Sequence, residues 1–598
     1  MSKYNSNHKE MKTPISKKIY AAALAFAGTC ALPWIVKSGG NALGFTNSIL
    51  SVFVFLGLFW LFYKALEISF SGGLKKWILP WFFGTAFSLC MVMGTCLDEQ
   101  GSVPFNNVRM WAAILILAVI FTLLTRYFWE KLMELRKEGT QKQESAGKPL
   151  GWLRFSGIIF LLYIPVFLAV YPGFFVYDAQ DELLQVMTRS FTTHHPLVHV
   201  LFLGGVISLV HKLTGSYNLG IACYTVIQMG IMAGIFGWCV GKLKNRGLKK
   251  GYVALTVLYF GLCPVLVMFS LCSAKDGLFA GMLLIMVVML SELLRVPESF
   301  MASKGKMALL AAASLLMMLL RHNGVYAFIV FSLVLVVYLK RYWKKLLVYL
   351  ALIFGAYLIV HNALTLVLSA DASENQEILT VPISQMARVY QNNKDSLPEE
   401  EKEILYRYLS DEALQQYTPK VSDGVKVHFN NQAFAKDKGS FLKLWLKWGA
   451  ENPFTYLNAW FMTSYGFWYP DTVIDVYRGN TVFTYTYEDS SYFGYEVEQP
   501  GTRQSILPGL NEIYRRMSLE IFQQKVPVVS MLFSPGFLFW VTAFCLCFWT
   551  YQKRMEKVVP YLPVICCYAT VLFGPTYLVR YVVYFWAVLP LLLAEFDN

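Results

Sequence analysis

Apolar stretches long enough to cross a membrane dominate this sequence. A bilayer core requires about 20 mostly apolar residues per helix, and we identify fifteen candidate stretches among the 598 residues. They fall at about 19–36, 47–67, 77–97, 109–128, 153–172, 196–212, 217–240, 251–271, 277–295, 307–320, 324–339, 345–368, 527–549, 558–573 and 577–594. Helices satisfy their own backbone hydrogen bonds in lipid. The sequence therefore predicts an all-α polytopic membrane protein.

The composition excludes several other classes of protein. Hydrophobic residues make up 56% of the chain and charged residues only 15%, against about 25% charged residues in ordinary soluble domains. The chain has too little charge to coat a string of soluble domains or to stay disordered. Its 11 cysteines lie in or beside the hydrophobic stretches, so a secreted disulfide framework is also excluded.

The positions of Lys and Arg predict the orientation in the membrane. Cytoplasmic loops carry an excess of these residues, and they concentrate in five segments: 1–18, 126–154, 242–250, 340–345 and 553–557. The turns 98–108 and 173–195 carry few and should lie outside. The N- and C-termini are then cytoplasmic, in a plasma membrane. This placement assigns most of the +14 net charge to topology and anionic lipid headgroups, and no basic–aromatic pattern requires a nucleic-acid partner.

Cytoplasmic termini require an even number of crossings, whereas fifteen stretches are present. One stretch therefore does not cross completely. The stretch 196–212 is short and carries His199 and His211; the short pair 307–320 and 324–339 is the alternative. We expect about fourteen transmembrane helices.

The chain divides into four predicted regions. A four-helix transmembrane extension covers 1–150, a transmembrane module 151–369, a polar outer loop domain 370–525, and C-terminal transmembrane helices 526–598. Glu and Leu recur at helical spacing over 398–414. Trp and Tyr over 441–468 favour helices at the membrane interface. The loop domain is either a cap that hugs the membrane or a lid over a lipid-linked substrate.

An acidic group follows the fifth stretch. Asp178 lies three residues from Asp181 and four from Glu182, so the three share one face if the segment is helical. Paired carboxylates bind a divalent cation or raise one another's pKa, which makes one of them a base. The alternative is a solvated helix whose N-terminal acids interact favourably with the helix dipole.

Two further polar groups lie on the predicted outer side. His195 and His199 have the spacing of metal ligands on a helix, or they are interfacial histidines beside Pro196. Lys275 and Asp276 lie between two apolar stretches. They either neutralise each other in a short turn, or Lys275 points into a cavity that holds phosphate.

Basic residues also interrupt the apolar stretches near the C-terminal half of the chain. The run Arg321-His322-Asn323-Gly324 separates two short spans, and Arg580 follows another. Irregular backbone at membrane depth is tolerated mainly where it lines protein or a wet cavity, and Arg321 suits bidentate binding of an anionic headgroup. A single Arg near a helix end also often extends its side chain to the interface without further function.

The order of these motifs resembles the GT-C superfamily of polytopic glycosyltransferases, and most closely a bacterial branch of it. The resemblance covers about 153–369, and a weaker similarity extends over 452–471. The motifs that carry it are Tyr177-Asp178, His195-Pro196, Pro264 followed by Lys275-Asp276, and Arg321-His322-Asn323-Gly324. It implies a GT-C-like catalytic module at 151–369 and an inverting transfer of a sugar from a polyprenyl-phosphate donor. The acceptor is an envelope glycan, lipid or protein at the outer face.

The resemblance also implies roles for individual residues. Asp178 acts as the base or, with Glu182, holds Mg or Mn, and Asp181 or Glu182 assists. The loop reads Asp-Ala-Gln-Asp-Glu where the family has adjacent Asp and Glu, so the identity of the catalytic acid stays open. The implied substrate-binding residues, several of which stabilise the lipid phosphate, are Lys275, Asp276, Arg321, His322, His195, Arg580, Tyr177 and Arg388. We expect Asp178, Lys275 and Arg321 to converge within one cavity that opens outward.

A transporter or lipid flippase is the competing class, because it also combines many spans with charges and broken helices. Against it, the sequence shows no convincing internal repeat, and its polar residues gather toward one face. In a structural membrane protein, the third class, these ionisable residues would be incidental.

Overall fold

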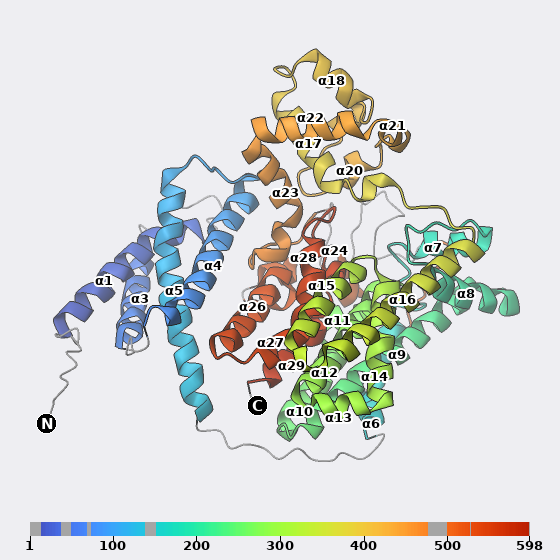
Figure 1. Cartoon of the computed structure of the whole chain (residues 1–598), viewed down its shortest axis with the longest axis horizontal. Coiled ribbons are helices and arrows are strands. Elements are labelled where there is room, and N and C mark those ends of the chain that lie inside the picture. The colour runs from blue at the N-terminus through green and yellow to red at the C-terminus, as the bar shows by residue number, and fades with distance from the viewer. Residues whose placement is uncertain are drawn as a thin grey trace. The chain divides into compact units, whose positions relative to one another are not determined.

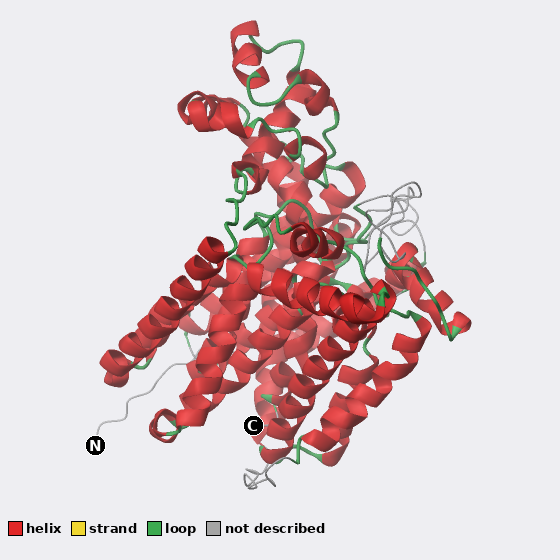
Figure 2. Cartoon of the chain, turned by 90° about the vertical axis from the view of Figure 1, so that its right-hand side faces the viewer, coloured by secondary structure: helices red, strands yellow, loops and turns green. Residues whose placement is uncertain are grey.

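The computed structural model describes residues 14–36, 49–67, 73–137, 151–476, 499–526 and 528–596. Within these ranges the secondary structure is helical, with three isolated β-bridges and no strand (Figure 2). The predicted all-α class is therefore confirmed for the described part of the chain. Several residues used to predict orientation lie outside it, namely Lys3, Lys9, Lys12, Lys142 and Lys148.

The chain forms two compact units, Met1–Gly139 and Thr140–Asn598. In the first, α4 (Lys75–Gln100) packs along α5 (Val108–Lys137), and α1 (Pro14–Ala31) packs against α3 (Leu50–Glu67). Ala25, Phe62 and Ile120 lie in its hydrophobic core. Close packing of α4 on α5 depends on Gly84, since a Cβ there would lie 2.5 Å from the backbone nitrogen of Thr122.

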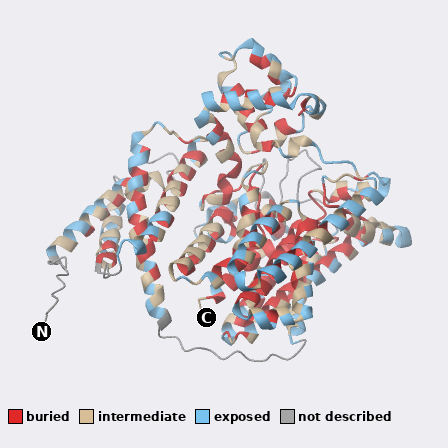
Figure 3. Cartoon of the chain, in the orientation of Figure 1, coloured by how far each residue is buried: buried red, intermediate tan, exposed pale blue. Residues whose placement is uncertain are grey.

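The second unit is built around one buried helix, α12 (Lys275–Arg295), whose residues are almost all inaccessible to solvent (Figure 3). A helix that is apolar on every side is stable only when other helices cover it. The helices packed against α12 include α9 (Tyr217–Asn245), α14 (Lys304–Leu320) and α29 (Tyr584–Ala594). Further apolar helices complete this part of the unit: α6 (Leu153–Ala169), α8 (Leu197–Thr214), α10 (Lys250–Leu262), α11 (Pro264–Leu271), α15 (Asn323–Tyr338), α16 (Trp343–Val367), α26 (Pro535–Tyr551) and α28 (Leu562–Val571).

Among the described residues, seven helices are long and apolar enough to cross a membrane, or eight if the bent pair α10–α11 forms one span. Three of the seven lie in the first unit, namely 15–34, which includes α1, together with α4 and α5; α8, α9 and α12 are among those in the second. Five shorter apolar helices accompany them: 50–66, α6, α15, α26 and α29. These lengths and compositions are those of a multi-pass membrane protein.

The predicted continuous span 251–271 is broken in the structure. Helices α10 and α11 meet at a bend of 52°, where Cys263 is extended with ψ 116° and Pro264 starts the second helix. Proline disfavours helical geometry in the residue before it and lacks the N–H that continues a helix. The stretch 196–212 forms α8, which is long and apolar enough to cross a membrane. The pair 307–320 and 324–339 forms α14 and α15, of 17 and 16 residues.

The polar region carries short helices at one end of the apolar helices (Figure 1). It has its own core, which includes Tyr390, Leu405, Phe441 and Trp448. Trp448 belongs to this core, and Tyr465 is also buried. The helix expected over 398–414 is divided in two at Ser410, whose side chain accepts from the backbone N–H of Ala413. The helices are α17 (Thr380–Asn393), α18 (Glu399–Tyr406), α19 (Asp411–Gln415), α20 (Asp423–Lys426), α21 (Asn431–Lys436), α22 (Lys438–Glu451) and α23 (Pro453–Trp468).

Candidate functional site

Two loops that are distant in the sequence are joined by backbone hydrogen bonds. Phe174 forms a parallel bridge with Cys272. Its N–H donates to the carbonyl of Leu271 at 3.2 Å, and its carbonyl accepts from the N–H of Ser273 at 2.9 Å. The chain leaves this bridge toward Asp178 on one side and toward Lys275 on the other. These two side chains, 97 residues apart in sequence, are brought together in this way.

The short helix α7 (Ala179–Thr188) begins directly after Asp178. The chain enters it through Tyr177, which has a positive φ of 65°. The N–H of Glu182 donates to the carbonyl of Asp178 at 2.9 Å, so the two residues are one turn apart, and both side chains reach Lys275. Asp181 does not join them; it lines a separate cavity.

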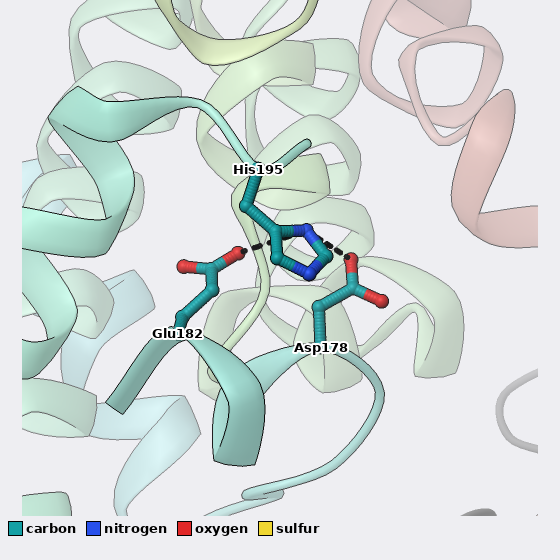
Figure 4. A group of neighbouring side chains, drawn as sticks. All are labelled: Asp178, Glu182 and His195. Atoms are coloured by element: carbon teal, nitrogen blue, oxygen red, sulfur yellow. Dashed lines mark ion pairs between the residues drawn. The ribbon is translucent and has the colours of Figure 1, made fainter. Parts of the chain in front are cut away.

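The ammonium group of Lys275 is the centre of the site. It lies 2.7 Å from Asp178 Oδ2, 3.2 Å from Glu182 Oε1 and 3.3 Å from His195 Nδ1. Figure 4 shows the two carboxyl groups on either side of the His195 ring. An ammonium group has three N–H donors, and each has an acceptor here. The first turn of α12 thus presents its charge to residues from α7 and from the loop before α8.

Arg580, on the 3-10 turn η6 (Val579–Tyr581), extends this network. Its Nη2 donates to Asp178 Oδ2 at 2.8 Å and its Nε to Asp276 Oδ2 at 3.0 Å. The other oxygen of Asp276 binds Arg321 Nη1, which joins Arg321 to the same network. Asp178, Lys275 and Arg321 therefore converge in one network, as expected, but none of them lines the cavities of about 20 and 690 Å³ beside it. Asp276 is 0% exposed, so it positions the two guanidinium groups and is inaccessible to a substrate.

Aromatic rings cover the guanidinium groups. The Arg580 Cζ lies 4.4 Å from the centre of the Tyr177 ring, and the Arg321 Cζ lies 5.0 Å from that of Tyr581. Both contacts fall within the range of cation–π attraction. The rings exclude water from one side of each cation, which strengthens its interaction with the carboxylates. They also fix the direction in which each guanidinium points.

A second chain of hydrogen bonds leads away from Glu182. Its Oε2 is bound by His199 Nδ1, and His199 Nε2 lies 2.9 Å from the Tyr224 hydroxyl. That hydroxyl donates to Gln228 Oε1 at 2.7 Å, while the Gln228 amide group donates to the carbonyls of Phe269 and Cys272. Both ring nitrogens of His199 are therefore engaged, one by Glu182 and the other by Tyr224.

This chain of hydrogen bonds differs from the predicted metal pair. His195 precedes α8 and His199 lies within it, so the two rings do not share a helix face. Tyr224 and Gln228 were not predicted as site residues. Their signal in the sequence is two polar groups four residues apart in an otherwise apolar stretch, where unpaired polar atoms are costly. Their contacts hold the loop before Lys275 in place.

Burial and neighbouring charges determine the protonation states. Burial alone would raise the pKa of the Asp178 carboxyl, but Arg580 and Lys275 hold that pKa well below its ordinary value. Burial would also raise the pKa of the Glu182 carboxyl, but the neighbouring His199 and Lys275 lower it to about 2. Burial and the Lys275 charge lower the pKa of His195 to about 4. The two acids are therefore ionised, and His195 is neutral at pH 7.

The protonation of His195 decides how its contacts work. Its Nδ1 lies 3.8 Å from Asp178 Oδ2 and 4.0 Å from Glu182 Oε1, the pairs drawn dashed in Figure 4. Since the ring is neutral, these are polar contacts, and Nδ1 accepts from the Lys275 ammonium. His195 can therefore take part in hydrogen bonding to a substrate without contributing charge.

The residues do not fit a divalent metal ion. Ligand atoms of Asp178, Glu182 and His195 lie within 4.8 Å of one another, a spacing compatible with a shared ion. The Lys275 ammonium already contacts all three. Three cations, Lys275, Arg321 and Arg580, already face the three carboxylates of the network, so the two additional positive charges of a metal ion would be repelled. A metal would have to displace Lys275 from a buried position.

The remaining predicted residues lie beside the network. His322 Nε2 donates to the carbonyl of Thr193 at 3.1 Å. With His195 and His361 it lines a cavity of about 20 Å³, large enough for one water molecule. Arg388 lies on α17, among the helices of the polar region, where it donates to the carbonyl of Asn458.

Fold and site together define a helical protein with membrane-length apolar helices and a buried network of ion pairs where several of them begin. Residues 175–596 match the family described as "Family of unknown function (DUF6020)". This match spans more than half of the chain, which therefore belongs to that family. It contains every residue of the ion-pair network. No match was found among curated proteins or among solved structures.

Proposed function

We propose that this protein is an integral membrane glycosyltransferase with a GT-C-like fold. In this proposal it transfers a sugar from a polyprenyl-phosphate donor to an acceptor at the outer face of the plasma membrane. The proposal includes about fourteen crossings, with both termini in the cytoplasm as the positions of Lys and Arg predict. The resemblance of the motif order to GT-C enzymes supports this activity, and so does the chemistry of the ion-pair network.

The observation that carries the proposal is the graded exposure of the three carboxylates. The Asp178 side chain is 28% exposed, whereas those of Glu182 and Asp276 are 1% and 0% exposed. A general base must reach the proton it removes, and of these three only Asp178 is accessible to an acceptor hydroxyl. Glu182 and Asp276 serve to orient the cations.

The transfer proceeds as one displacement at the anomeric carbon. The acceptor O–H bond breaks, and its proton passes to an Asp178 oxygen as the acceptor oxygen bonds to that carbon. The bond from the anomeric carbon to the phosphate oxygen breaks, and its electron pair leaves with the polyprenyl phosphate. Attack from the face opposite the leaving group inverts the configuration.

The ion pairs couple proton transfer to departure of the phosphate. In the resting protein the charges of Lys275 and Arg580 are directed at Asp178, at 2.7 and 2.8 Å. Once Asp178 is protonated it no longer neutralises them, and they become available to the negative charge that develops on the phosphate. Preorganised charge of this kind is commonly the largest catalytic contribution. Arg321, 14% exposed, is placed to bind the same phosphate.

The opposite end of α12 supports the proposed orientation. Glu595 binds Arg246 at 2.9 Å, Lys557 at 3.3 Å and Arg295 at 3.6 Å. Arg246 and Lys557 belong to two turns predicted to be cytoplasmic. The 21 residues of α12 span about 30 Å, close to the thickness of the hydrocarbon core. With this basic end in the cytoplasm, Lys275 would lie at the outer face, as the proposal requires.

The substitution Asp178→Asn tests the proposal. It removes the base and keeps the shape, so we expect sugar transfer to fall by about 100-fold or more, in line with loss of a general base. Binding of the polyprenyl-phosphate donor should be retained or become tighter, because Lys275 and Arg580 lose a competing carboxylate. Transfer and donor binding are measured on the purified full chain in lipid nanodiscs.

The matched control is Asp395→Asn, an exposed aspartate of the polar region, which should behave as the wild type. Thermal stability of each variant shows whether a loss of transfer reflects misfolding. Full transfer by a folded Asp178→Asn protein would contradict the proposed base. Lipid movement across the membrane without sugar transfer, in both wild type and variant, would instead support a flippase.

A further inference from the structure

A large cavity lies beside the ion-pair network, between α7 and the start of the polar region. Its volume is about 690 Å³, within the usual range for small-molecule sites. One side is formed by α7 and the loop 190–195, and the other by residues 371–377, with Val427 between them. Both sides belong to the second compact unit.

The two sides of the cavity are fixed to each other through the backbone. The N–H of Thr193 donates to the carbonyl of Asp371 at 2.8 Å, and the N–H of Asp371 donates to the carbonyl of Phe191 at 2.9 Å. The Thr193 hydroxyl accepts from the N–H of Ser373 at 3.0 Å. The cavity therefore exists before any ligand binds, which lowers the entropic cost of binding.

The cavity and the network share one residue. His195 lines the cavity, and its Nδ1 lies 3.8 Å from Asp178 Oδ2 and 3.3 Å from the Lys275 ammonium. Asp181, another lining residue, is three residues beyond Asp178 on the same short helix. A molecule held in this cavity can thus reach the proposed base past the His195 ring.

The lining is rich in hydrogen-bonding groups and in negative charge. Among the described residues that line the cavity there is no Lys or Arg. Four carboxylates line it, those of Asp181, Asp371, Glu374 and Glu377, and the last lies 2.9 Å from the Lys426 ammonium. The lining also includes the hydroxyl residues Thr188, Ser190, Thr192 and Ser373 and the amide residues Gln185 and Gln376.

This lining is opposite in charge to what a phosphate requires. Carboxylates and amide oxygens accept hydrogen bonds from hydroxyl groups and attract amines, whereas they repel anions at short range. The anionic donor is therefore excluded from the cavity and directed to Lys275, Arg321 and Arg580. The cavity suits the second substrate of the proposed reaction.

We propose that this cavity binds the acceptor, and that the acceptor is a polyhydroxylated molecule without negative charge, such as a neutral or amino-sugar glycan chain. The role of the bound molecule as the acceptor rests on the proposed function. The binding part of the inference, which says what kind of molecule enters the cavity, does not depend on that function.

Three oligosaccharides of equal length test the binding part: chitotriose, which is neutral; a glucosamine trimer, which is cationic; and a galacturonic acid trimer, which is anionic. Binding is measured by calorimetry on the full chain in nanodiscs, without a donor. We expect the neutral and cationic trimers to bind and the anionic trimer to bind at least tenfold more weakly. Equal or tighter binding of the anionic trimer would overturn the proposal, as would no binding of any trimer.

Substitutions place this binding in the cavity. Ala372→Trp fills it with an indole ring and should reduce trimer affinity at least tenfold. Ala435→Trp on α21, an exposed alanine that does not line the cavity, is the matched control and should bind as the wild type. Unchanged affinity in a folded Ala372→Trp protein would overturn the location.

Charge reversal provides a second readout that does not depend on blocking the cavity. In the double variant Asp371→Lys/Glu374→Lys, the affinity for the anionic trimer should rise relative to that for the cationic trimer. An unchanged ratio of the two affinities would contradict the proposed charge recognition. Glu403→Lys, exposed on α18, is the control. Trimer binding that is confined to the cavity, in a protein unable to transfer sugar, would leave the binding part intact and overturn only the proposed function.

Discussion

Asp276 shows how one residue determines the geometry of a site that it does not itself expose. Each of its oxygens binds a different guanidinium, Arg321 and Arg580. The two cations come from positions 45 and 304 residues away in the sequence. A carboxylate that is completely buried requires such partners, because an unpaired charge in the protein interior is very unfavourable. The need to neutralise Asp276 thus holds both cations beside Asp178.

The buried neutral His195 predicts a dependence of stability on pH. Its pKa of about 4 in the folded protein lies below the ordinary value of 6.5. Between pH 6.5 and pH 4 the unfolded chain binds a proton that the folded protein does not, so stability falls as the pH falls through this window. From pH 7 to pH 5 the loss is about 2 kcal/mol.

The substitution His195→Gln removes this contribution. Thermal melts at pH 7 and pH 5 should show a smaller decrease of Tm in the variant than in the wild type. His428→Gln, which changes an exposed histidine, should retain the full decrease. Equal decreases in the wild type and in His195→Gln would show that His195 already carries its proton in the folded protein at pH 5. The carboxyls of Asp178 and Glu182 act in the same direction only below about pH 4.5, since their pKa values are lowered.

At the level of elements, the site depends on helices that begin or end beside it. The end of α11 at Leu271 frees carbonyl groups, and those of Phe269 and Cys272 accept from Gln228. The chain then turns back into α12, and this turn brings the backbone of Gly277 very close to that of Phe269. A Cβ on Gly277 would lie 2.1 Å from the carbonyl oxygen of Phe269, a distance at which the backbone must move. Gly277 is therefore needed for the first turn of α12, which carries Lys275 and Asp276.

The substitution Gly277→Ala tests this requirement. It should displace Lys275 and reduce sugar transfer at least tenfold, with a lower Tm, because overpacking costs about 1–3 kcal/mol. Gly230→Ala on α9 is the matched control. A Cβ at Gly230 meets nothing within 4 Å, and replacing a helical Gly by Ala is otherwise stabilising by up to about 1 kcal/mol. Similar activity and Tm for the two variants would refute the close-contact argument.

For the whole molecule, sequence reasoning predicted the class of fold and much of the network. The length of the apolar stretches was sufficient to predict the all-α class. Charged residues are costly in lipid, and this cost singled out Asp178, Lys275, Arg321 and Arg580. The break at Pro264 was not predicted, because hydropathy is averaged over a stretch of residues and does not detect a bend. The pairing of Asp276 with two arginines is a contact between distant segments, which spacing along one chain does not reveal.

The same limit applies to the polar residues on either side of the network. The hydrogen bonds from His199 through Tyr224 to Gln228 cross between helices, and the spacing of His195 and His199 left a metal pair and interfacial histidines as open alternatives. The cavity beside α7 is formed together with residues 371–377, nearly 200 positions later. The core of the polar region likewise packs Trp448 against residues distant in the sequence, a contact that composition does not reveal.

The close balance of charge in the ion-pair network has a consequence for the rate of substrate capture. Three cations and three carboxylates lie close together, so their fields largely cancel beyond the roughly 10 Å over which salt at 0.1 M screens charge. The anionic lipid donor of the proposed reaction would then not be drawn in from a distance; it would arrive by lateral diffusion and bind only on contact. We expect its association rate, followed by stopped-flow fluorescence, to change less than twofold between 50 mM and 500 mM NaCl. A steep decline with salt, as in electrostatically steered association, would indicate long-range attraction instead.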